Sequence, residues 1–61
     1  MIYHVQSEGV NGWLTHDTIE DEKAARKRYR AVLSKLSEYL GTAHVRLIDA
    51  LDNVVEDSDN A

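Results

Sequence analysis

The stretch from Thr18 to Leu40, TIEDEKAARKRYRAVLSKLSEYL, decides the fold, because its apolar residues repeat with the period of an α-helix. At about 100° per residue, one side of this stretch forms an apolar stripe made of Ala25, Tyr29, Val32, Leu36 and Leu40, with Leu33 and Tyr39 on its flanks. The opposite side is polar and carries Lys23, Lys27, Arg30, Ser34 and Glu38, with Arg26 at its edge. We therefore predict one amphipathic helix.

Both ends of this helix have local signals. The hydroxyl of Thr18 can accept a hydrogen bond from an open amide of the first turn, so we expect Thr18 to be the N-cap. The acidic run Glu20–Glu22 then lies at the positive end of the helix dipole, and Glu22 can pair with Arg26 one turn later. Gly41 can take the left-handed conformation that ends a helix.

Two short segments before the helix have the composition of β-strands. Met1–Ser7 contains β-branched and aromatic residues and is followed by Glu8-Gly9, which is a turn signal. Val10–His16 contains a second turn signal, Asn11-Gly12. We expect these two segments to form an antiparallel hairpin.

The number of loop residues decides which side chains of this hairpin share a face. An even number places on one face Tyr3, Val5, Leu14 and His16, and on the other Ile2, His4 and Trp13. An odd number reverses the second strand. We favour the even number.

Two further strands are expected after the helix. Ala43–Ala50 alternates, with apolar side chains on both faces, and Val54–Glu56 follows a predicted two-residue turn at Asp52-Asn53. The last residues, 57–61, are polar and acidic, and we expect a frayed tail. The prediction is an α+β fold in which residues 1–56 form a single domain. Its order is β-β-α-β-β, with a small antiparallel sheet of three to four strands packed on one amphipathic helix.

Size and composition limit the class of protein. A chain of 61 residues buries only about 60% of its unfolded surface, so its core is thin. The absence of cysteine excludes disulfides and thiol chemistry. The sequence has no apolar run long enough for a membrane span and no signal-peptide pattern, so we expect a soluble, cytoplasmic protein without membrane partners.

Charge is distributed in three blocks. Residues 1–22 contain five acids and no Lys or Arg, residues 23–35 contain six bases and no acid, and the remainder contains six acids and one base. The net charge of −4 argues against a broad positive surface for nucleic acid. The helix differs locally, because its exposed side carries a cationic stripe of Lys23, Arg26, Lys27 and Arg30. This stripe supports an alternative prediction, a small nucleic-acid-binding regulator.

One helix covers only one face of such a sheet, so the other face is solvated, self-paired or bound by a partner. With an even loop, that open face carries Ile2, His4, Trp13, His44, Arg46 and Ile48. A mixture of Trp, His, Arg and aliphatic side chains is typical of protein interfaces. We therefore predict a partner-binding face. The alternative is that Trp13 folds inward as the main aromatic residue of the core.

The sequence carries no pattern for metal binding or catalysis. His4, His16 and His44 lack the close spacing of histidine ligands, and the acids near the C-terminus lack the glycine and final glutamate of a calcium loop. The serines have no histidine at an instructive spacing, and no glycine-rich phosphate loop is present. We expect no metal, cofactor, small-molecule substrate or enzymatic activity.

The leading functional prediction is a small non-catalytic protein–protein interaction module that acts through the uncovered sheet face. Its partner is another protein, a second copy of the chain as a homodimer, or both. An inhibitor, an adaptor or a regulatory protein would fit this description, including the short proteins that phages and mobile elements encode.

Overall fold

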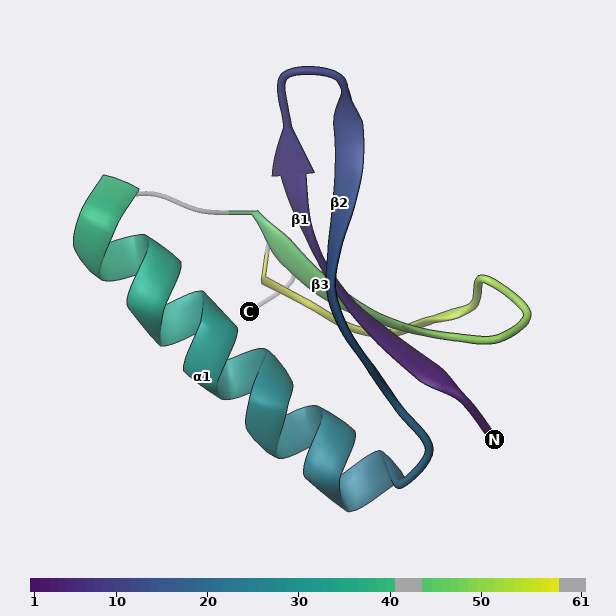
Figure 1. Cartoon of the computed structure of the whole chain (residues 1–61). Helices are drawn as coiled ribbons and strands as arrows, with labels where there is room; N and C mark the ends of the chain where they lie inside the picture. Colours follow the sequence, from purple (N-terminus) through teal and green to yellow (C-terminus); the bar gives the residue numbers. More distant parts are fainter. Residues whose placement is uncertain (41–43, 59–61) are drawn as a thin grey trace.

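The computed structural model describes residues 1–40 and 44–58, without the side chains of residues 39 and 40. Four strands form one antiparallel sheet in the order β2-β1-β3-β4, and one helix packs on β1, β2 and β3 (Figure 1). The elements are β1 (Tyr3–Gly9), β2 (Gly12–Ile19), α1 (Glu22–Leu40), β3 (Val45–Asp49) and β4 (Val54–Asp57). The predicted fold class and element order are confirmed.

The core lies between α1 and one face of the sheet. The sheet contributes Val5, Val45 and Leu47, each with no exposed surface. The helix contributes its predicted apolar stripe, in which Ala25, Tyr29 and Val32 are buried and Leu33 and Leu36 pack against them. The predicted flank and end of this stripe, Tyr39 and Leu40, have side chains outside the described residues.

Tyrosines, and not Trp13, are the aromatic residues of this core. Tyr3 and Tyr29 are buried, and the Tyr3 hydroxyl donates a hydrogen bond of 3.1 Å to Glu22 Oε1 at the start of the helix. Burial and this carboxylate raise the pKa of Tyr3. The alternative interpretation of Trp13 as the main core aromatic is therefore wrong.

The first hairpin has the favoured register near its tip. Gly9 pairs with Gly12, so the loop consists of Val10 and Asn11, and Trp13 pairs with Glu8. The left-handed step falls on Gly12, with a φ of 116°, where a side chain would be strained. Both strands extend beyond their predicted ends, because β1 continues to Gly9 and β2 to Ile19.

A β-bulge explains why β2 is longer than predicted. The register shifts between Val5 and Gln6, so that Val5 faces Asp17 and Gln6 faces Thr15, with His16 as the extra residue. The shift turns Ile19 toward the helix side, where it packs against the core. Thr18 therefore lies inside a strand, and its prediction as the helix N-cap is wrong.

Asp21 is the N-cap of α1. Its Oδ2 accepts a hydrogen bond of 2.8 Å from the Ala24 amide, and its carbonyl accepts one of 2.8 Å from the Ala25 amide. The helix begins at Glu22, and the predicted pair of Glu22 with Arg26 is present at 3.5 Å. The predicted helix end at Leu40 is confirmed, whereas Gly41 lies outside the described residues.

The second hairpin turns over residues 50–53 and not over the two predicted residues Asp52-Asn53. Asp49 organises this turn, because its Oδ1 accepts hydrogen bonds from the amides of Leu51 (2.9 Å) and Asn53 (3.0 Å). Asp52 has a φ of 64°, which aspartate tolerates better than most residues. Asp57, predicted to begin the frayed tail, is the last residue of β4.

Candidate functional site

The sheet face opposite the helix carries side chains in three rows across the strands. Strand pairing and side-chain alternation assign the residues to these rows. The first row contains Thr18, His4, Ile48 and Val54, and the second contains Thr15, Gln6, Arg46 and Asp57. The third row contains Trp13, Glu8 and, just before β3, His44. We call these eleven residues the open face. Most of the predicted partner-binding residues belong to it.

Trp13 lies across the third row. It belongs to the edge strand β2, yet its ring contacts two residues on the far side of β1. The Arg46 guanidinium carbon lies over the indole, 3.9 Å from the ring centroid, and the His44 ring meets it edge-on with a centroid distance of 4.8 Å. Trp13 is half-buried, so these contacts fix the ring while part of it stays exposed.

Arg46 is itself held by a hydrogen-bond chain through the second row. Its Nε donates to Gln6 Oε1 at 2.9 Å, and Gln6 Nε2 donates to Thr15 Oγ1 at 3.0 Å. This chain connects β3, β1 and β2. The guanidinium that stacks on Trp13 is therefore oriented by neighbouring strands as well as by the ring.

His44 connects the open face to β4. Its Nδ1 lies 3.2 Å from Glu8 Oε1, and its Nε2 lies 2.8 Å from Asp57 Oδ1. Next to it, the Val45 amide donates a hydrogen bond of 2.9 Å to Ser58 Oγ. Asp57 and Ser58 were expected in a solvated tail, but they help to attach β4 to the sheet.

Two of the predicted partner-binding residues differ from expectation. Ile48 lies on the open face beside His4 and Val54, but it is only 2% exposed and belongs to no part of the core under the helix. It is therefore buried on the open face and contributes almost no exposed surface for a partner. Ile2 precedes β1 and is 40% exposed.

Two exposed aliphatic residues near Ile48 were not among the predicted site residues. Val54 faces the same side as Ile48 and is 51% exposed, and Leu51 in the adjoining turn is 75% exposed. Their exposure depends on the second hairpin, whose turn was predicted in a different place. A correct prediction of that turn would have placed both residues at the edge of the open face.

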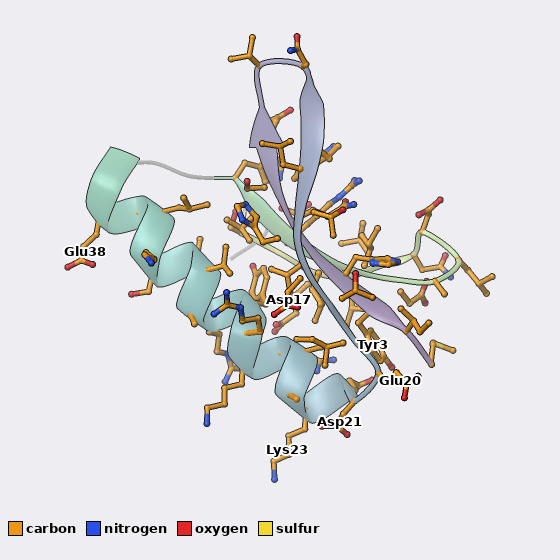
Figure 2. All side chains as sticks on the ribbon, viewed as in Figure 1. Tyr3, Asp17, Glu20, Asp21, Lys23 and Glu38 are labelled. Atoms are coloured by element: carbon orange, nitrogen blue, oxygen red, sulfur yellow. The ribbon has the colours of Figure 1, made fainter. Side chains whose placement is uncertain are left out.

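The cationic stripe of the helix lies on its exposed side, as predicted. Lys23, Lys27 and Arg30 are exposed, and Figure 2 shows Lys23 projecting away from the sheet. Arg26 is half-buried and belongs to a salt-bridge network, because its guanidinium lies 3.5 Å from Glu22 and 3.2 Å from Glu56. The stripe therefore consists of three exposed cations and one that is already neutralised.

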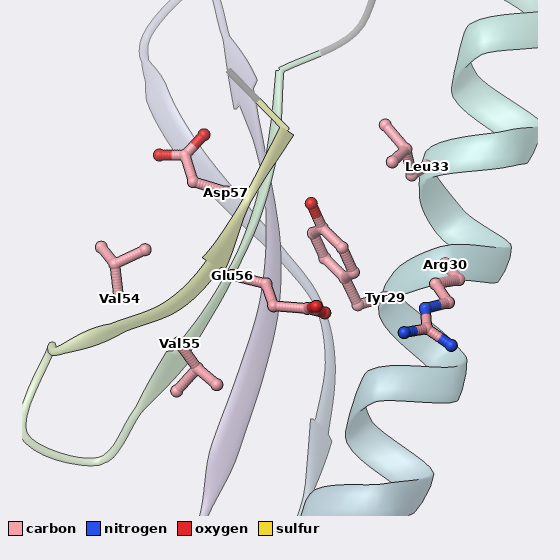
Figure 3. Close-up of a pocket in the computed structure, with 7 residues that line it drawn as sticks. All are labelled: Tyr29, Arg30, Leu33, Val54, Val55, Glu56 and Asp57. Atoms are coloured by element: carbon pink, nitrogen blue, oxygen red, sulfur yellow. The ribbon is translucent and has the colours of Figure 1, made fainter. Parts of the chain in front are cut away.

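A cavity of about 590 Å³ lies between α1 and β4, and Figure 3 shows its lining. Tyr29 and Leu33 come from the helix, and Val55 and Glu56 from the strand. Burial raises the pKa of Tyr29, and the carboxylates of Glu56 and Asp57 raise it further. The Glu56 carboxylate uses Oε1 for Arg26, whereas its buried Oε2 has no hydrogen-bond partner among the described residues.

The three histidines have different hydrogen-bond partners. His4 bonds the Thr18 hydroxyl at 3.0 Å and His44 bonds the two carboxylates, whereas His16 points to the helix side and bonds the buried Ser7 hydroxyl at 2.6 Å. Across residues 1–40 and 44–58, no group of three or more His, Cys, Asp or Glu side chains is arranged to hold a metal ion.

Comparisons with known proteins add no relative. No protein-family model, no curated protein and no solved structure matches this chain. In the described part of the chain, no helix is long and apolar enough to cross a membrane.

Proposed function

We propose that this chain is a small non-catalytic interaction module that binds a protein partner on the open face, with a second copy of itself as the first partner to test. One observation carries the proposal. Trp13 is kept out of the core and is fixed between Arg46 and His44 with part of its ring exposed. Tryptophan and arginine are the residues that most often dominate binding energy at protein interfaces.

Pre-organisation of Trp13 favours binding. A ring that is already fixed loses little conformational freedom when a partner covers it, so more of the contact energy contributes to affinity. Three exposed aliphatic residues add apolar surface at and near the first row, namely Val54 within it and Ile2 and Leu51 close to it in the chain. An aromatic anchor beside aliphatic side chains and polar groups resembles the composition of interface centres.

The proposal of a non-catalytic role rests on how the polar groups of the open face are used. Glu8 and Asp57 bond His44, and Gln6 links Arg46 to Thr15. These contacts connect strands to one another, which is a structural use of the polar side chains.

The test measures association with and without Trp13. The wild-type chain, Trp13→Ala and the control Leu14→Ala are compared by size-exclusion chromatography with light scattering at two concentrations a hundredfold apart. Leu14 neighbours Trp13 in β2 but faces the other side and is 62% exposed. We expect a dimer that Trp13→Ala weakens about tenfold or more, with unchanged helix content by circular dichroism, and that Leu14→Ala preserves.

A monomeric wild-type chain moves the test to another protein. The same three chains are then immobilised, and the proteins that each retains from an extract of the source cells are identified and purified. The proposal requires a purified protein that binds wild type and Leu14→Ala and that loses affinity for Trp13→Ala. Equal binding by all three chains would reject the open face as the docking surface.

A second candidate function is supported by the exposed cations of the helix. Lys23, Lys27 and Arg30 have no ion pair among the described residues and follow one exposed side of α1. Such a row can contact phosphates. Fluorescence anisotropy with duplex DNA, single-stranded DNA and RNA at low salt tests this function. Binding that Lys27→Glu with Arg30→Glu abolishes would support it, and no binding at low salt would exclude it.

A further inference from the structure

His44 joins three strands on the open face. The residue precedes β3, its Nδ1 lies 3.2 Å from Glu8 on β1, and its Nε2 lies 2.8 Å from Asp57 on β4. Its ring also makes a T-shaped contact with Trp13 from β2, on which Arg46 is stacked. Protonation of a single imidazole can therefore act on both the sheet edge at β4 and the half-buried Trp13.

The number of N–H groups on the His44 ring limits how many hydrogen bonds it can donate to the two carboxylates. An ionised carboxylate only accepts hydrogen bonds, and a neutral imidazole has a single N–H to donate. Both contacts can be hydrogen bonds at once only when His44 is an imidazolium with two N–H groups. Among the described residues, the charged groups next to it include the carboxylates of Glu8 and Asp57 and the guanidinium that stacks on Trp13. Two carboxylates at hydrogen-bond distance favour the positive ring.

Loss of the proton affects the two carboxylates unequally. The Asp57 contact is shorter, and the Asp57 side chain is 19% exposed, so the remaining N–H stays on Nε2. The bare Nδ1 then faces the Glu8 carboxylate, and two acceptors at 3.2 Å repel each other. Glu8 has a 57% exposed side chain and can turn into water. The His44 ring then loses its side-chain bond to β1, next to its contact with Trp13.

We propose that His44 is a protonation switch for the open face: the imidazolium ties β1 to β4 and supports Trp13, and the neutral ring releases Glu8 and loosens that support. One consequence of the switch, tighter partner binding at lower pH, rests on the proposed function. The switch itself is a property of the isolated chain. Its stabilising effect is complete while His44 is protonated and is lost as pH rises through its titration.

Trp13 reports this protonation directly, because it is the only tryptophan of the chain. A protonated imidazole in contact with an excited indole quenches its fluorescence, and a neutral one quenches it much less. Emission of the wild-type chain is therefore recorded from about pH 5 to pH 8, the range where histidine titrates. We expect emission to rise with pH in one step. His44→Gln removes this step, and the control His4→Gln keeps it.

Carboxylate variants sharpen the test. Glu8→Gln and Asp57→Asn each remove a negative charge that favours the imidazolium, so each should move the step to lower pH, with the larger shift for Asp57→Asn. Ring NMR signals of His44 in the wild-type chain supply an independent titration if a variant fails to fold. A flat emission profile, a step that survives in His44→Gln, or an NMR midpoint that differs from the emission midpoint would overturn the switch.

The fluorescence and NMR titrations use no partner, so they separate the switch from the proposed function. If association through Trp13 is found, its affinity should be higher below the midpoint than above it, and Glu8→Gln should reduce this difference. If His44 titrates but association does not depend on pH, His44 does not regulate binding, and the predicted pH dependence of partner affinity is rejected. Absence of association with an intact titration would reject the proposed function alone.

Discussion

The two faces of the sheet come from the same strands but have different chemistry. Under α1, alternate residues such as Val5, Val45 and Leu47 are fully buried against the helix. On the open face, the residues between them are joined by side-chain hydrogen bonds and by the stack of Arg46 on Trp13. The helix-covered face excludes water, whereas the open face is ordered by polar contacts that water can also reach.

The size of the chain explains this difference. A chain of 61 residues has one helix and can bury only one sheet face deeply, so most of its folding free energy comes from apolar burial there. Polar contacts on the other face contribute less, because water competes for the same groups. The open face can therefore change for binding at smaller cost to the fold. Three predictions test this division, in order of expected effect.

The largest effect should come from adjacent residues of β3 that face opposite ways. Leu47→Ala removes a fully buried side chain and should lower the free energy of unfolding by about 2–5 kcal/mol. Arg46→Ala removes the stack on Trp13 and the bond to Gln6, and should cost about 1–2 kcal/mol. Urea denaturation followed by circular dichroism measures both. Equal losses would show that the open face is a second core of the same importance.

A smaller effect concerns the attachment of the helix that covers the first face. Asp21→Ala removes the N-cap and should lower the free energy of unfolding by about 1 kcal/mol, whereas Asp21→Asn should keep most of it. Thr18→Ala should cost less, because Thr18 lies in β2 and its bond to His4 is exposed. Thermal denaturation of the three variants measures the order. A larger loss of stability from Thr18→Ala than from Asp21→Ala would favour Thr18 as the N-cap, as predicted from the sequence.

The smallest effect should come from the turn between β3 and β4, whose hydrogen bonds lie within the turn itself. The Asn53 backbone N–H, with help from Leu51 and the Asn53 side chain, holds the pKa of Asp49 below its usual value. A lowered folded-state pKa means that this carboxylate stabilises the fold at neutral pH, and that the contribution is lost as pH falls below about 4.

The difference between wild type and Asp49→Asn measures this contribution. Urea midpoints should separate the two chains at neutral pH and approach each other in acid. A separation that stays constant from neutral pH to about pH 3 would show that Asp49 acts through its shape and not through its charge.

Periodicity predicted the helix and its buried side correctly, because an amphipathic stripe is a local property of about five turns of chain. Its first residue was wrong for a physical reason. Thr18 and Asp21 are both good N-caps, and the choice between them depends on where β2 ends. The bulge at His16 lets β2 continue to Ile19 and bury it, and a bulge depends on pairing with β1.

Most of the residues predicted for the candidate site lie on the open face, but the contacts between their side chains were not predicted. Alternation assigned His4, Trp13 and Arg46 to the face opposite the helix, and the pairing of the strands agrees. The stack of Arg46 on Trp13 could not be predicted, because it joins strands that are separated by β1. Burial of Ile48 likewise depends on β4, whose length and turn were predicted differently.

The strands, the helix, their order along the chain and the buried side of the helix could be predicted from the sequence, because they follow from the spacing of apolar residues. The strand order in the sheet, the bulge, the helix start at Glu22 and the placement of His44 between Glu8 and Asp57 depend on tertiary contacts. These features join residues that are far apart along the chain. They are set by the pairing of strands that together must cover one thin core.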